Sequence, residues 1–211
     1  IIHHPQIYAG EATGALFQVK VFHIGLQTSP LFFQSGYFCA MLIASISGIR
    51  GTIGGQVGEG LNPPDVVRFA AGYALWVKEE SKKEQPIIVV GRDARLSGQM
   101  VRDCLVGTLN ALGVHVIDLG LSTTPTVELA VTGEGADGGI VLTASHNPKQ
   151  WNALKLLDAS GEFLSSERGG RVLELAKLDV VYSEIDAIGT TKVQDGWMER
   201  HVRHALELDL V

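Results

Sequence analysis

The chain has 211 residues, of which 45% are hydrophobic and 19% are charged. This composition is typical of a folded globular protein and argues against general disorder. Its 17 basic and 23 acidic residues leave a net charge of −6 and form no block of Lys and Arg, so the charge pattern expected of a DNA- or RNA-binding protein is missing. A few well-placed cations can still bind a phosphorylated metabolite.

The sequence also indicates no membrane association. Its most apolar stretch, from Leu31 to Ile46, is broken by polar residues and is shorter than the roughly 20 apolar residues that a membrane-spanning helix needs. We find no basic region of the kind that begins a secretory signal. Cys39 and Cys104 lack the spacing of metal ligands, so we expect a cytoplasmic protein, although a disulfide between them stays open.

Residues 1–40 differ from the rest of the chain. They carry only two formal charges, Glu11 and Lys20, and show no sustained period of 2 or 3.6 residues. Met41 then stands directly before a segment with regular patterns. We interpret residues 1–40 as an atypical N-terminal extension outside the main domain. The alternative is that they add an edge strand and a helix to the fold.

The first predicted helix covers about residues 64–81. Asn62 is a typical N-cap residue, and prolines follow it in the first turn. Apolar residues then recur at helical spacing, which indicates one buried face. They are Val66, Phe69, Ala70, Tyr73, Ala74 and Val77. Residues 87–90 form a short, continuous apolar run, which is typical of a strand covered on both faces.

The same alternation continues towards the C-terminus. Ser97 is the predicted N-cap of a second helix, whose apolar face runs from Met100 to Leu112 and which ends at Gly113. Further strands are expected at 114–119, 138–143 and 154–157, and further helices at 125–132, 166–178 and 195–208.

Short strands separated by helices predict an α/β fold with right-handed crossovers. We expect a mainly parallel (mixed) sheet between two layers of helices, in a three-layer α/β/α domain over residues 41–190. The segment 178–193 is polar and irregular, and we interpret residues 191–211 as the first helix of a truncated second domain. Ligands of such sheets bind beyond the carboxyl ends of the strands, so the residues that follow the strands are the candidates for chemistry.

The loop after the strand at 138–143 carries a candidate nucleophile. It reads TASHNP over residues 143–148, which would project the Ser145 hydroxyl into a cleft whose backbone N–H groups can cradle an anion. His146 or a nearby lysine could activate the hydroxyl. Neighbouring side chains point in different directions and the G-x-S-x-G elbow is missing, so a hydrolase pair is disfavoured. The alternative interpretation is an Asn-Pro turn with its usual polar residues.

The loop after the strand at 87–90 places two arginines beside a helix start. It reads GRDARLSG over residues 91–98, and the helix dipole and free N–H groups there would add to the charge of Arg92 and Arg95. We take Arg92 as a candidate phosphate-binding residue. The alternative is structural: Asp93 pairs with one of the arginines, Arg95 in particular, and fixes the loop.

Other candidates are less specific by themselves. Arg50 lies in a glycine-rich turn, SGIRGTIGG over residues 47–55, which lacks the spacing of nucleotide-binding motifs. Lys155 follows Ser145 by ten residues, and a lone lysine is usually a solvated surface charge. His201 and His204 lie three apart on a predicted helix, but no third metal ligand is visible.

Taken together, these segments resemble the amino-terminal part of the α-D-phosphohexomutase superfamily, which includes phosphoglucomutase, phosphomannomutase and phosphoglucosamine mutase. The segments are SGIRG at 47–51, GRDARLSG at 91–98, TASHNP at 143–148 and WNALK at 151–155. Ordered motifs with suitable spacing are far more specific than any one of them. The resemblance runs from about residue 41 to the end of the chain and does not include residues 1–40.

The resemblance implies a phosphotransferase mechanism. Ser145 matches the serine that is phosphorylated in the resting enzyme, gives its phosphate to a sugar monophosphate, and recovers the other phosphate from the bisphosphate intermediate. His146 and Asn147 match the residues that flank the phosphoserine. Arg50 and Lys155 match cationic positions of the active site, where Lys155 is expected to help proton transfer.

The resemblance also implies Mg²⁺, held by the phosphate on Ser145 and by an aspartate-rich D-x-D-x-D-R loop of the second domain. That loop is not in this sequence, nor are the sugar-selecting and distal phosphate-binding loops of later domains. We therefore expect a fragment that does not complete a turnover alone.

The expected substrate is a phosphorylated glucosamine, mannose or glucose, with SISGIRGTIGG at 45–55 favouring glucosamine. Two alternatives stay open: a phosphosugar-binding module of the same fold without catalysis, and a serine hydrolase that uses Ser145 and His146.

Overall fold

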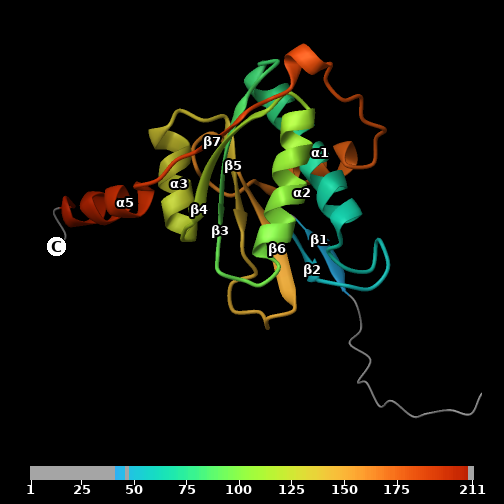
Figure 1. Cartoon of the computed structure of the whole chain (residues 1–211), viewed down its shortest axis with the longest axis horizontal. Helices are drawn as coiled ribbons and strands as arrows, with labels where there is room; N and C mark the ends of the chain where they lie inside the picture. Colours follow the sequence, from blue (N-terminus) through green and yellow to red (C-terminus); the bar gives the residue numbers. More distant parts are fainter. Residues whose placement is uncertain (1–40, 46–47, 209–211) are drawn as a thin grey trace, which may run out of the picture. The chain divides into compact units, whose positions relative to one another are not determined.

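The structure is a computed structural model that describes residues 41–45 and 48–208; the expected extension at 1–40 lies outside these ranges (Figure 1). The strands are β1 (Leu42–Ser45), β2 (Gly48–Thr52), β3 (Ile87–Arg92), β4 (His115–Leu121), β5 (Gly138–Leu142), β6 (Trp151–Leu157) and β7 (Thr191–Val193). The helices are α1 (Pro63–Ser81), α2 (Gly98–Ala111), α3 (Thr124–Gly133), α4 (Ser166–Leu175) and α5 (Trp197–Leu206), with a 3₁₀ turn, η1 (Ile185–Ala187). Within these ranges, we find no helix with the length and apolar character needed to cross a lipid bilayer.

All the described strands belong to one mixed sheet, in the order β1-β2-β6-β5-β3-β4-β7. Strands β5, β3, β4 and β7 run parallel to one another. Strands β1, β2, β6 and β5 pair antiparallel, each with the next. The sheet therefore has a parallel half and an antiparallel half, and the predicted α/β/α fold with a mixed sheet is confirmed.

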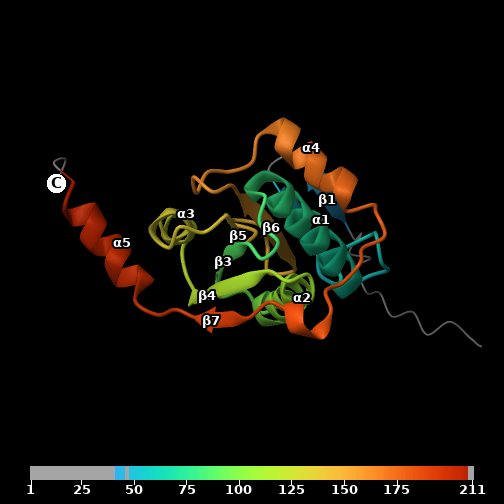
Figure 2. The same cartoon turned by 90° about the horizontal axis from the view of Figure 1, so that it is seen from above.

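The two faces of the sheet carry different helices (Figure 2). Helices α1, α2 and α4 share one hydrophobic core with inward-facing residues of β2, β3, β5 and β6, among them Ile88 and Val90. Val89, between those two residues, points to the opposite face and packs with α3. Helix α3 packs mainly on β3 and β5 and shares its buried cluster with Leu157 at the end of β6. On the same face, Arg50 of β2 and Ala153 and Lys155 of β6 line a cavity instead.

The largest difference from the sequence prediction is at residues 48–52, which form strand β2 instead of a glycine-rich turn. Glycine is required there by close packing. A Cβ at Gly48 would lie 2.4 Å from the Leu154 carbonyl oxygen, and one at Gly51 would lie 2.8 Å from the Met41 oxygen. The glycines thus let neighbouring backbone approach β2, and the chain bends only after Thr52.

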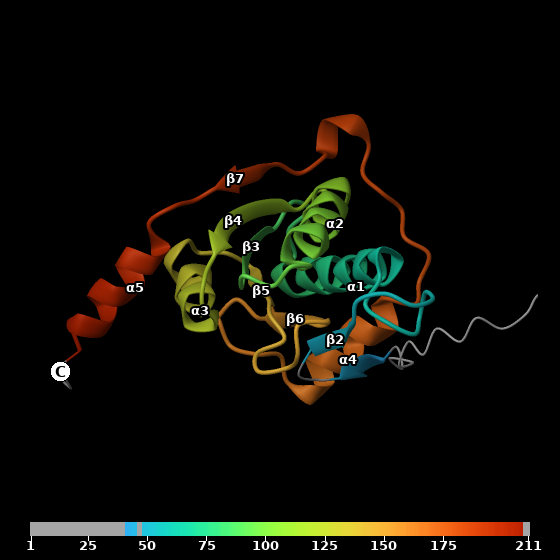
Figure 3. The ribbon, with the colours of Figure 1, turned by 60° about the horizontal axis from the view of Figure 1, so that its bottom comes forward.

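The C-terminal segment also contains a strand that the sequence did not indicate. Strand β7 extends the sheet beside β4, within the segment predicted to be irregular (Figure 3). Helix α5 follows it, and the buried ring of Trp197 packs against Gly133 at the end of α3. The assignment of residues 191–211 to a second domain stays a prediction.

Candidate active site

A cavity of about 600 Å³ lies over β2 and the first part of β6. It is lined by Gly48, Arg50, Thr143, Ala144, Ser145, His146, Asn147, Ala153, Lys155, Phe163, Leu164, Ser165 and Ser166. These residues come from the two strands, from the loop between β5 and β6, and from the segment that leads into α4. Five of the six predicted site residues are therefore brought together, with Arg92 as the exception.

Ser145 lies three residues beyond β5, in a tight turn that the Asn147 N–H closes by donating to the Ala144 carbonyl at 3.0 Å. Its φ of +53° is in the left-handed region, which costs a residue with a Cβ about 1–2 kcal/mol. The Ser145 N–H donates to Thr143 Oγ1 at 3.0 Å, which helps to hold this conformation. The exposed side chain lines the cavity.

Arg50 and Lys155 reach the cavity from neighbouring antiparallel strands. Arg50 is paired with Ala153 across the β2–β6 ladder, and Lys155 is two residues further along β6, so both side chains leave the same face of the sheet. The Lys155 ammonium lies 5.6 Å from the centre of the Phe163 ring. In the described part of the chain neither side chain forms an ion pair, and no carboxylate lines the cavity.

Because the described residues supply two cations and no carboxylate to this cavity, it is favourable for an anion, even in a chain whose net charge is −6. The site therefore fits a phosphate group better than any cation.

His146 and Asn147 contribute to the cavity in different ways. The Asn147 side chain donates to the Ala144 carbonyl at 2.9 Å, so it also stabilises the turn that carries Ser145. His146 is exposed and, among the described residues, has no hydrogen bond to Ser145. A Ser-His pair of the hydrolase type is therefore not formed in this arrangement.

Arg92 is not among the residues that line the cavity. Its guanidinium donates to the Asp93 carbonyl at 3.2 Å and to Gln99 Oε1 at 3.2 Å, and both acceptors are local. The helix start beside it, at α2, lies at the end of β3 instead of over β2 and β6. The phosphate-binding role predicted for Arg92 gains no support from this geometry.

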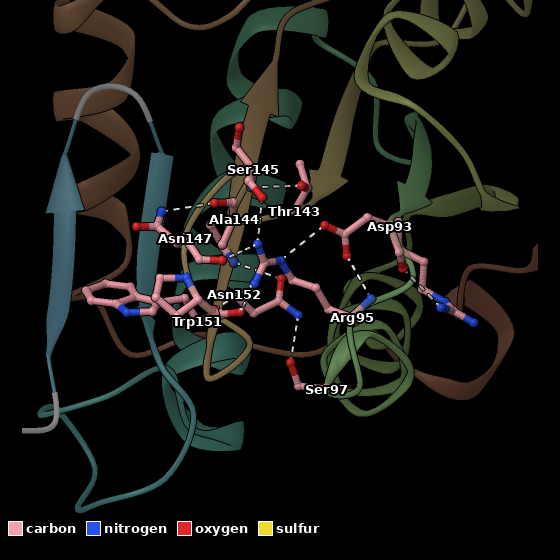
Figure 4. A network of polar contacts seen from close by, with 12 residues as sticks. Asp93, Arg95, Ser97, Thr143, Ala144, Ser145, Asn147, Trp151 and Asn152 are labelled. Atoms are coloured by element: carbon pink, nitrogen blue, oxygen red, sulfur yellow. Dashed lines mark hydrogen bonds and ion pairs between the residues drawn. The ribbon is translucent and has the colours of Figure 1, made fainter. Parts of the chain in front are cut away.

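Arg95, on the same loop, crosses to the Ser145 loop instead (Figure 4). Its guanidinium donates to four backbone carbonyl groups, those of Ser145 (2.7 Å), Asn147 (2.8 Å), Pro148 (2.9 Å) and Trp151 (3.0 Å). Its Nε donates to Asp93 Oδ2 at 3.2 Å. The structural alternative considered for the arginines, pairing with Asp93 to fix the loop, is thus what Arg95 does.

Comparison with known proteins agrees with the geometry. The family described as "phosphoglucomutase/phosphomannomutase, alpha/beta/alpha domain I" matches residues 42–177, well over half of the chain. The chain belongs to this family.

Individual relatives support the same assignment. The chain is 41% identical over 127 residues to a phosphoglucomutase/phosphomannomutase of Thermococcus kodakarensis, covering 59% of this chain and 28% of the relative. It is 38% identical over 122 residues to a phosphoglucosamine mutase of Lacticaseibacillus casei, covering 57% and 26%. A solved structure from Thermus thermophilus, assigned as a phosphomannomutase, superposes with a TM-score of 0.65 at 28% identity, covering 82% of this chain and 37% of that one. The chain thus spans little more than a quarter of the length of these two sequence relatives.

The described part of this family member does not by itself provide a metal site. It contains no group of three or more His, Cys, Asp or Glu side chains placed to hold an ion. In particular, the His201 side chain lies 2.9 Å from Thr126 Oγ1, at the contact between α5 and α3.

Sequence reasoning missed several residues that line the cavity of this family member, namely Phe163, Leu164, Ser165 and Ser166. Ser165 is the N-cap of α4, where its hydroxyl accepts from the Arg168 N–H at 3.3 Å. The Ser-Ser pair before an apolar-periodic segment was a visible cap signal. Nothing in the sequence indicated that this cap lines the same cavity as Lys155, because that depends on how the chain turns after β6.

Proposed function

We propose that this chain is the phosphoserine-bearing part of a phosphohexomutase, an enzyme that interconverts sugar 1-phosphates and 6-phosphates through a bisphosphate intermediate. The observation that carries the proposal is the convergence of Ser145, Arg50 and Lys155 on one cavity, to which the described residues bring no carboxylate. Family membership supports the same reaction class. Phosphoryl transfer is catalysed chiefly by positioning and charge stabilisation, which is what such a cavity supplies.

In the proposed reaction the phosphate starts on Ser145 Oγ. A hydroxyl of the sugar monophosphate attacks the phosphorus, the Oγ–P bond breaks, and the new sugar O–P bond gives the bisphosphate. The attacking hydroxyl loses its proton to a base in the cavity, and Ser145 Oγ recovers one as it leaves. After the bisphosphate turns round, the reverse transfer of its other phosphate restores the phosphoserine and releases the isomeric monophosphate.

The cations have separate roles in this proposal. Arg50 is a permanent charge that stabilises the equatorial phosphoryl oxygens, because a guanidinium does not deprotonate. Lys155 can both neutralise phosphate charge and move a proton, since an ammonium is titratable. Asn147 and His146 flank the phosphoserine, and Asn147 keeps its turn closed. Phosphate binding by Arg92 stays a prediction, since its side chain contacts Asp93 and Gln99 and does not line the cavity.

The chain alone is proposed to hold the phosphoserine without completing a turnover. It spans 26–28% of the sequence relatives described above, and the described residues supply no metal site. Mg²⁺, as the proposed cofactor, would be held by the phosphate on Ser145 together with ligands from beyond these residues. A phosphorylated glucosamine, mannose or glucose is the proposed substrate, since relatives carry the names of mutases for each.

The test is mutase activity of the full-length protein with Ser145→Ala. We expect activity to fall by at least about a thousand-fold, because the group that forms the covalent intermediate is removed. Ser160→Ala is the matched control, since Ser160 is an exposed serine outside the cavity. Unchanged activity in the Ser145 variant would rule out the proposed role.

Two other outcomes separate the alternatives. A wild-type protein that binds sugar phosphates but shows no turnover and no phosphoserine would be a binding module of this fold. Labelling of Ser145 by a fluorophosphonate, without detectable phosphoserine, would indicate a hydrolase, although the missing Ser145–His146 hydrogen bond in the described part of the chain argues against it.

A further inference from the structure

We propose that Arg95 is a positioning residue for the phosphoryl-carrying serine: it fixes the backbone on the C-terminal side of Ser145 and so sets the direction of the Ser145 hydroxyl. This inference rests on the proposed function. It differs from the roles of Arg50 and Lys155, because Arg95 lies outside the cavity and touches no reacting group.

The first support is that every donor of the Arg95 guanidinium has an acceptor. A guanidinium has five N–H groups. Four of them reach the backbone carbonyls of Ser145, Asn147, Pro148 and Trp151, and the fifth reaches Asp93. Its side chain is only 11% exposed. A partly buried, planar guanidinium whose N–H groups are all hydrogen-bonded is rigid, so the loop that it contacts has little freedom to move.

The second support is where these contacts lie relative to the strained residue. Thr143 Oγ1 holds the N–H of Ser145, and Arg95 holds its carbonyl at 2.7 Å. The peptide groups on both sides of the left-handed residue are therefore fixed. In Figure 4 the Ser145 side chain points away from the guanidinium, while its carbonyl points towards it. Arg95 thus acts on the hydroxyl only through the backbone.

The third support is the anchorage of Arg95 itself. Asp93 accepts from the Arg95 backbone N–H at 3.0 Å, and the Asp93 N–H donates to the Leu142 carbonyl at the end of β5. The loop after β3 is therefore joined to the loop after β5 at two places: through the Asp93 N–H where both loops begin, and through the Arg95 guanidinium further along. Asn152 adds a further link, since its amide donates to Ser97 Oγ at 3.0 Å.

These contacts predict that lysine cannot replace Arg95 although it keeps the charge. One ammonium has three donors on a single nitrogen and cannot reach four carbonyls and a carboxylate. The experiment is steady-state kinetics of the full-length protein with Arg95→Lys. We expect kcat to fall roughly 10- to 100-fold with KM changed less than about threefold, because the phosphoserine is misplaced while Arg50 and Lys155 still line the cavity.

Arg102→Lys is the matched control. Arg102 is also a partly buried arginine, and it pairs with Asp118 of β4 and Asp103 of α2, neither of which lines the cavity. Arg102→Lys loses a comparable set of guanidinium hydrogen bonds away from the cavity, so it reports how much a loss of stability alone changes the kinetics. Equal kinetic losses in the two variants, or an unchanged kcat for Arg95→Lys, would overturn the positioning role.

A second measurement does not depend on activity. Backbone amide exchange at Ser145, Asn147 and Trp151 is expected to rise about 10-fold or more in Arg95→Lys and to stay unchanged in Arg102→Lys, since local opening controls exchange. If wild-type protein shows no mutase activity, the proposed function fails and this measurement alone decides whether Arg95 fixes the loop. Unaltered exchange would contradict it.

Asp93→Asn serves if Arg95→Lys does not fold. It keeps the guanidinium but removes the charge that anchors Nε. We expect a loss of kcat in the same direction but smaller, at constant KM. Wild-type kcat in a folded Asp93→Asn protein would count against the proposal.

Discussion

The two faces of the sheet differ in what covers them. On one face, three helices pack over β2, β3, β5 and β6 and bury a continuous apolar core. On the other face, α3 covers β3 and β5, and the adjoining strands β2 and β6 carry the cavity with Arg50, Lys155 and Ser145. Because successive side chains of a strand point to opposite faces of the sheet, a single strand can contribute to the apolar core on one face and to the cavity on the other.

Strand β6 shows the difference within three residues. Leu154 points into the three-helix core and is fully buried, whereas Ala153 and Lys155 on either side of it line the cavity. We call the face under α1, α2 and α4 the covered face, and the opposite face, which carries the cavity, the open face. Substitutions of core residues on the covered face should change the free energy of unfolding. Substitutions of cavity-lining residues on the open face should change the enzymatic activity. Each prediction below tests one side of that division.

The largest expected effect is on the open face. Lys155→Ala should lower kcat/KM by roughly 10²- to 10⁴-fold, the range for losing a positioned acid–base group. The free energy of unfolding should change by less than about 1 kcal/mol, since Lys155 has no ion pair among the described residues and loses only its contact with the Phe163 ring. Steady-state kinetics and urea unfolding measure both, with Lys192→Ala on the exposed edge strand β7 as the control.

The next effect is on the covered face, one residue away. Leu154→Ala should lower the free energy of unfolding by about 2–5 kcal/mol through lost burial and the cavity left behind. At a temperature where the variant stays folded, kcat should stay within about threefold of wild type, since the side chain points away from the cavity. A large loss of kcat without a loss of unfolding free energy would show that the two faces of the sheet do not have separate roles in stability and activity.

The smallest effect concerns Tyr73, in the covered core. Its hydroxyl lies 2.6 Å from the Leu157 carbonyl oxygen and 3.1 Å from that of Gly139. Tyr73→Phe should cost about 1–2 kcal/mol in unfolding free energy at neutral pH. Activity should be unchanged.

This residue also predicts a pH dependence. Burial raises the pKa of the Tyr73 hydroxyl well above its ordinary value. The unfolded chain then loses this proton near pH 10 while the folded chain keeps it, so stability falls with further rise in pH, by at most about 1.4 kcal/mol per pH unit. Tyr73→Phe lacks this pH dependence. The difference in unfolding free energy between the wild-type protein and the variant, measured by urea titration, should therefore become smaller between about pH 9 and 11. A constant difference would contradict the assignment.

Much of the fold followed from the sequence because its signals were local. Prolines after Asn62 marked the start of α1, and an apolar run marked the buried β3. The position of Ser145 directly after a buried strand also indicated its place beyond the carboxyl end of that strand, where such sheets bind their ligands. These features depend on periodicity and capping, which neighbouring residues determine.

Other features depend on partners far away in the chain. Short apolar runs do not reveal strand direction, so the antiparallel half of the sheet was not visible, and the glycines of β2 resembled a turn. Arg95 contacts backbone carbonyls 50 to 56 residues away. Every residue has a backbone carbonyl, so the residue types in the sequence do not show which carbonyls accept these hydrogen bonds. The link from Arg95 to the Ser145 loop therefore needed the structure.

The most direct test of the central claim is phosphate transfer to Ser145 itself. The full-length protein would be incubated with a ³²P-labelled hexose bisphosphate, digested, and its labelled peptide mapped by mass spectrometry. We predict label on Ser145 that a sugar monophosphate then removes, and no label in Ser145→Ala. Label on another residue, or label that persists when the monophosphate is added, would contradict the claim that this serine carries the phosphoryl group.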